Sequence, residues 1–79
     1  MATPITLLGI DPGYDRLGWA IGQLDSKQHY TSLDFGCIQT NAKDGIFQRY
    51  QEIQTELAAL LEEFHPTVAG IEAVFFSNN

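Results

Sequence analysis

The chain has 79 residues, enough for one small domain, and a chain near this size buries only about 60% of its unfolded surface. Ten acidic side chains against four basic ones give a formal net charge of -6. This charge repels nucleic acid in bulk, so any DNA affinity needs metal ions, a local patch or a further part of the protein. The single cysteine excludes a disulfide framework. With no leader-like or membrane-spanning apolar run, we expect a cytoplasmic protein without a membrane partner.

The first predicted element is a short strand that ends in a carboxylate. Leu7–Ile10 is an apolar run followed by Asp11 and a Pro-Gly turn, and Val68–Ile71 followed by Glu72 repeats the arrangement. Such runs are typical of strands buried on both faces, where an unpaired acid costs several kcal/mol. One acid before Pro-Gly is often only a turn residue. Two such acids together favour a metal site.

Two more strands are expected next, over residues 18–24 and 29–40, joined by a polar turn at 25–28. Short connections favour antiparallel pairing, so the first three strands should form a meander. Cys37, in the third strand, is predicted to be a small buried side chain.

A helix should follow the meander, because apolar residues recur at spacings of three and four. We expect Asp44 to cap its N-terminus and His65-Pro66 to end it, since a residue before proline avoids helical geometry. The predicted apolar stripe consists of Ile46, Phe47, Tyr50, Ile53, Leu57, Leu60, Leu61 and Phe64.

The fourth strand, beginning near Thr67, should lie parallel to the first, because a long helix is the crossover that parallel pairing needs. Asp11 and Glu72 would then lie at the same end of the sheet, on strands about 5 Å apart. Ligands of open α/β sheets bind at the carboxyl ends of strands. The predicted fold class is therefore α/β, with both acids at the ligand-binding edge.

A set of motifs along the whole chain resembles the N-terminal half of RuvC-type Holliday junction resolvases. Any one of them is weak, but their order and spacing are specific. The set comprises Gly9-Ile10-Asp11-Pro12-Gly13, Gly18-Trp19-Ala20, Gly36-Cys37-Ile38 before Thr40, Arg49, Pro66, Ile71-Glu72, Val74-Phe75-Phe76 and Asn79.

The resemblance implies a ribonuclease H-like fold, truncated here, with residues 1–79 as the N-terminal half of one nuclease domain. It implies a homodimer that cuts four-way DNA junctions with Mg2+ or Mn2+ and works with a branch-migration helicase complex. Asp11 and Glu72 would be two of four catalytic metal-binding acids, and Phe75 would contact junction bases. Arg16, beside Asp11 in the hairpin loop, is either a solvated charge or a phosphate contact.

Two other functions stay open on the residues alone. Actin-like ATPases and sugar kinases also begin with an Asp-x-Gly hairpin, although their loops are usually small and hydroxylated, unlike Tyr14, Asp15 and Arg16. A non-catalytic interaction module is the third class, with both acids as remnants. Further acids near the end of a later helix would identify a nuclease.

Overall fold

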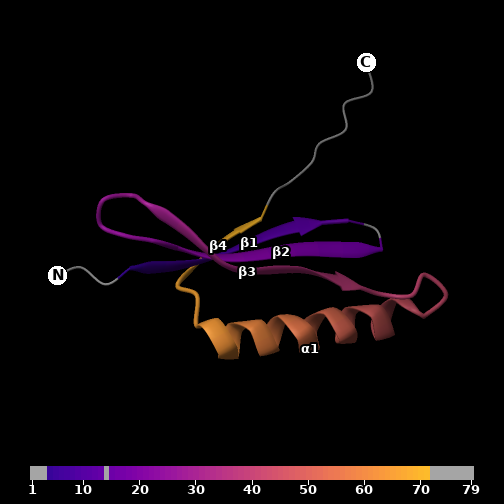
Figure 1. Cartoon of the computed structure of the whole chain (residues 1–79). Helices are drawn as coiled ribbons and strands as arrows, with labels where there is room; N and C mark the ends of the chain where they lie inside the picture. Colours follow the sequence, from indigo (N-terminus) through magenta and orange to yellow (C-terminus); the bar gives the residue numbers. More distant parts are fainter. Residues whose placement is uncertain (1–3, 14, 72–79) are drawn as a thin grey trace, which may run out of the picture.

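The computed structural model describes residues 4–13 and 15–71 of the chain. They form one four-stranded sheet and one helix (Figure 1). In chain order the elements are β1 (Ile5–Pro12), β2 (Arg16–Leu24), β3 (Tyr30–Gln39), α1 (Ile46–Phe64) and β4 (Val68–Ile71). No helix within these residues is long and apolar enough to cross a membrane.

The strand order is β3-β2-β1-β4, so the predicted meander and crossover are both confirmed. β1 pairs antiparallel with β2, from Ile5 opposite Leu24 to Pro12 opposite Leu17, and β2 pairs antiparallel with β3. β4 returns beside β1 in the parallel direction, with Ile10 opposite Ile71. β1 is therefore an interior strand, flanked by β2 and β4.

The core lies between the sheet and α1, which runs along one face of the sheet in Figure 1. Leu8, Ile21 and Ile38 come from three adjacent strands and are 0–3% exposed. Leu60 is the buried residue of α1. Since side chains alternate along a strand, the register places the three sheet residues on one face.

The opposite face of the sheet is uncovered within the described residues. By the same alternation it carries Phe35, Tyr30, Val68 and Ile5, which are 43–77% exposed. Cys37 lies on this face and is exposed, so its predicted burial was wrong. The expectation that the β1 and β4 runs are buried on both faces also failed, because a single helix covers a single face.

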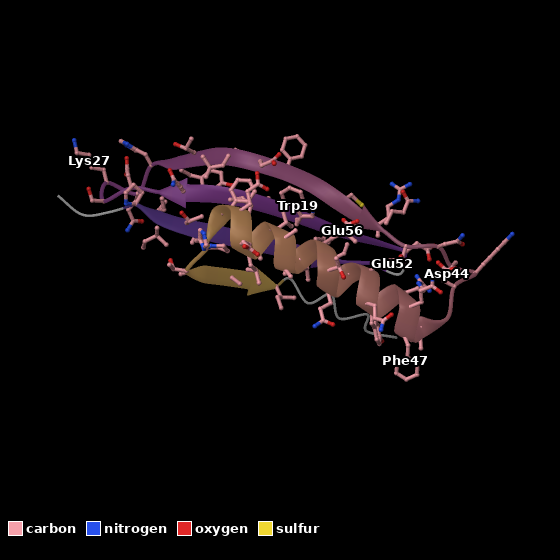
Figure 2. All side chains as sticks on the ribbon, turned by 90° about the horizontal axis from the view of Figure 1, so that it is seen from below. Trp19, Lys27, Asp44, Phe47, Glu52 and Glu56 are labelled. Atoms are coloured by element: carbon pink, nitrogen blue, oxygen red, sulfur yellow. The ribbon has the colours of Figure 1, made fainter. Side chains whose placement is uncertain are left out.

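The apolar residues of α1 divide into two groups, which corrects the single predicted stripe. Ile53, Leu57 and Phe64 are half-buried and flank the buried Leu60. A second group is 47–82% exposed, and Figure 2 shows Phe47 projecting away from the sheet. That exposed group is Ile46, Phe47, Tyr50 and Leu61.

The two ends of α1 agree only partly with the sequence. Its N-cap is Gly45, with no side-chain cap hydrogen bond, so the Asp44 cap was wrong. Asp44 belongs to the preceding turn, where its N–H donates to the Asn41 carbonyl at 3.0 Å. The predicted end is confirmed: His65 adopts a left-handed conformation, φ 50°, and donates its N–H to Leu61.

Candidate functional site

Asp11 is the second-to-last residue of β1, at the carboxyl end of an interior strand. Its register partner on β2 is Gly18. A Cβ built at Gly18 would be 3.7 Å from the Asp11 Cβ, an ordinary van der Waals contact. Asp11 is exposed, and within residues 4–13 and 15–71 its carboxylate has no hydrogen bond or ion pair. The structure thus offers an exposed carboxylate on an interior strand, without a partner in the described part of the chain.

β4 approaches the same place from the other side of β1. The parallel register pairs Gly9 with Gly70 and Ile10 with Ile71. Asp11 follows Ile10 directly, and Glu72 follows Ile71 directly. Glu72 itself lies outside the described residues, as does Phe75.

An open hollow of about 600 Å³ adjoins Asp11. Four of its nine lining residues are glycines, so much of its wall is main chain rather than side chain. All four strands contribute to it, which places the hollow across the centre of the sheet. Its lining residues are Gly9, Ile10, Asp11, Gly18, Trp19, Ala20, Gly36, Gly70 and Ile71.

The carboxylate oxygens of Asp11, at the carboxyl end of β1, suit a hard cation, but Asp11 cannot hold one alone. Mg2+ prefers oxygen ligands and keeps several waters, so a few carboxylates on strands are an appropriate donor set. Among the residues that the structure describes, no group of three or more His, Cys, Asp or Glu could hold a metal ion. A metal site here therefore needs carboxylates in addition to the one described.

Arg16 is the first residue of β2 and is exposed, opposite Gln39 of β3. The sequence placed Arg16 in the hairpin loop and began the second strand at residue 18, so β2 starts two residues earlier than predicted. The contact of Arg16 with a phosphate stays a prediction.

The sequence did not reveal a polar network that holds this hairpin. Arg49 of α1 donates from Nε to the Thr40 hydroxyl at 3.0 Å and from a terminal nitrogen to the Asp15 carboxylate at 3.2 Å. The available signal was the position of Arg49, one helical turn before Ile53 on the covered side of α1. A cation there needs a buried or half-buried partner.

Comparison with known proteins gives a consistent picture. The family model described as "Crossover junction endodeoxyribonuclease RuvC" matches residues 7–79. Curated proteins of that name are similar over most of this chain. The relative from Synechocystis is 43% identical over 72 residues, covering 89% of this chain and 42% of the relative. The relative from Endomicrobium trichonymphae is 39% identical over 70 residues, covering 89% of this chain and 37% of the relative. The chain thus spans less than half the length of these relatives.

Solved structures agree on the fold. A Thermus thermophilus RuvC structure matches with a TM-score of 0.84 at 23% identity, covering 95% of this chain and 46% of that one. T. thermophilus RuvC in complex with a Holliday junction substrate matches with a TM-score of 0.83 at 21% identity, covering 95% and 48%. The predicted ribonuclease H-like arrangement of three antiparallel strands, crossover helix and parallel fourth strand is confirmed.

Proposed function

Because the chain belongs to the RuvC family of crossover junction endodeoxyribonucleases, we propose that it is the N-terminal half of a nuclease domain that resolves four-way DNA junctions. The intact enzyme hydrolyses phosphodiesters in recombination and repair. Its substrate class is supported by the neighbouring T. thermophilus protein, whose structure contains a Holliday junction.

The observation that carries this proposal is the parallel pairing of β1 with β4. Ile10 and Ile71 are register partners, and each directly precedes an acid, Asp11 or Glu72. Paired residues of parallel strands are about 5 Å apart and share a face. A continued register brings the two carboxylates within reach of one ion. The topology supports the pair as two of the catalytic acids.

The proposed cofactor is Mg2+, with Mn2+ as a substitute. Two such ions supply an activated water and stabilise the charge on the leaving oxygen. Asp11 is the better residue to be shared between them, because its strand is interior to the sheet. Glu72 would hold one ion at the edge. The remaining acids belong to the part of the domain that this chain does not contain.

The proposed partner is a four-way junction bound by a homodimer, in association with a branch-migration helicase complex. A net charge of -6 gives this half little attraction for phosphates, so local contacts must supply it. Arg16, an exposed cation at the start of β2, is the proposed phosphate contact. Phe75, three residues after Glu72 in the sequence, is the proposed aromatic contact with junction bases.

Binding of Mn2+ to the 79-residue chain tests the metal site. We expect weak binding, because only part of the ligand set is present. Paramagnetic broadening of NMR signals should centre on Asp11 and Glu72, and Asp11→Asn should reduce it.

Glu63→Gln is the matched control, because it removes one negative charge from an exposed position of α1, away from the carboxyl end of β1 where Asp11 lies. This variant should keep the broadening at Asp11. Broadening spread evenly over the helix acids, and unchanged by Asp11→Asn, would contradict the metal site.

The base contact is tested by Phe75→Ala in an enzyme completed with the second half of a relative. Stacking of a base on an aromatic ring is worth about 1–3 kcal/mol, so cleavage of four-way junctions should fall by roughly five-fold or more. Metal binding and the circular dichroism spectrum should stay unchanged. Wild-type cleavage by this variant would refute the stacking role.

A further inference from the structure

We propose that Arg49 is a positioning residue, which fixes the β1–β2 hairpin and thereby the carboxylate of Asp11. The inference deepens the proposed function and rests on it. It concerns how the metal-binding end of β1 is held in place before any ion binds.

Arg49 joins three segments that are distant in the sequence. Its Nε–H donates to Thr40, the residue after β3, at 3.0 Å, and a terminal N–H donates to Asp15 of the hairpin at 3.2 Å. The third segment is α1 itself, which carries the arginine. A planar guanidinium can serve two acceptors in fixed directions, whereas a lysine ammonium is a single point charge.

Thr40 and Asp15 are also joined through the main chain. The Thr40 N–H donates to the Asp15 carbonyl at 3.2 Å. Thr40 is 7% exposed, so losing a partner for its hydroxyl would leave a polar group away from water. The Arg49–Asp15 ion pair contributes less, because the Asp15 side chain is 60% exposed. We call the contacts among Arg49, Thr40 and Asp15 the Arg49 clamp. The hydrogen bond to the buried Thr40 hydroxyl is therefore its stronger part.

The hairpin and α1 are not fully packed against each other. A small cavity of about 30 Å³ lies between the hairpin and the helix, lined among others by Gly13, Asp15, Thr40 and Ile53. The hydrogen bond from Arg49 to Asp15 is a direct polar contact between the hairpin and α1.

The position of the hairpin directly affects the position of Asp11. Asp11 and Pro12 are the last two residues of β1, opposite Gly18 and Leu17 at the start of β2. The connection from Pro12 to Arg16 is only three residues long, so a displaced Asp15 pulls on both strand ends. Metal ligation tolerates displacements of only a few tenths of an ångström. Loosening the hairpin should therefore weaken ligation by Asp11.

Two pairs of variants in the 79-residue chain test the inference, with amide hydrogen exchange and Mn2+ broadening as readouts. Arg49→Gln removes the guanidinium group that donates to both acceptors. Leu60→Val lowers the folding stability from a core position outside the Arg49 clamp. Thr40→Val removes the hydroxyl with little change of shape, and Thr40→Ser keeps it. Circular dichroism shows which variants fold. If Arg49→Gln does not fold, the Thr40 pair decides, since it leaves the arginine in place.

We expect Arg49→Gln and Thr40→Val to speed exchange of the residue 40 amide roughly tenfold and to weaken Mn2+ binding at Asp11 roughly tenfold. Thr40→Ser should leave the exchange rate and the Mn2+ binding close to those of the unsubstituted chain. Leu60→Val should change global stability without a selective effect at Asp11.

Three results would overturn the inference, and they are distinguishable. Unchanged exchange at residue 40 would show that Arg49 does not hold the hairpin. Faster exchange with unchanged Mn2+ affinity would show a structural role only, with the proposed metal site intact. No broadening at Asp11 in the unsubstituted chain would overturn the proposed function and, with it, the positioning role.

Discussion

Residues 1–79 alone are expected not to cut four-way junctions in the presence of Mg2+. Two-metal hydrolysis needs its carboxylates complete, and this chain supplies Asp11 and Glu72 of a proposed set of four. Within the described residues no cluster of acids or histidines can replace the missing ones. The measurement is a cleavage assay with a labelled junction over a series of protein concentrations.

The Asp11→Asn chain, purified in parallel, is the control for this assay. Trace cleavage that is equal in both preparations is contamination by another nuclease. Metal-dependent cleavage that Asp11→Asn abolishes would contradict the expected inactivity, because it would show that the ligands in this chain suffice.

The second large effect concerns self-association of the chain. The sheet face opposite α1 exposes Phe35, Tyr30 and Val68 by 50–77%, and β4 is an edge strand. Extended apolar patches and unpaired edges promote contacts between chains. We expect the sedimentation coefficient to rise with concentration.

Two exposed phenylalanines allow a matched test of which surface is used. Phe35, 77% exposed, lies on the uncovered sheet face, and Phe47, 82% exposed, lies on α1. Phe35→Thr should weaken association roughly tenfold, since burying such a ring is worth about 1.5–3 kcal/mol. Phe47→Gln should leave it unchanged. A monomer at every concentration would contradict the association, and equal effects of both variants would contradict its location.

The architecture was predictable because its signals are local. Short turns indicate the meander, and a long amphipathic segment between strands indicates a parallel crossover, which the pairing of Leu7 with Val68 confirms. Errors arose where burial depends on what covers a surface. Cys37 and Phe47 are residue types that are common in protein cores, but both are exposed here. The single helix covers only one face of the sheet, and only one side of the helix is buried against it. The cap at Gly45 instead of Asp44 is a shift of one residue, which local propensity does not resolve.

The candidate site was predictable to a similar extent. The place of Asp11 at the carboxyl end of an interior strand followed from topology, and the structure confirms that placement. The roles of Asp11, Glu72, Phe75 and Arg16 stay predictions. The Arg49 clamp escaped prediction because its acceptors come from two other segments, and no local pattern shows that they meet.

The most direct test of the central claim is junction cleavage by a completed enzyme. Residues 1–79 are joined to the part of the Synechocystis relative that this chain does not match. The account predicts that this chimera cuts four-way junctions when Mg2+ is supplied, that Asp11→Asn lowers the rate by orders of magnitude, and that Glu63→Gln does not. An Asp11→Asn chimera that cuts junctions at the rate of the unsubstituted chimera would contradict it.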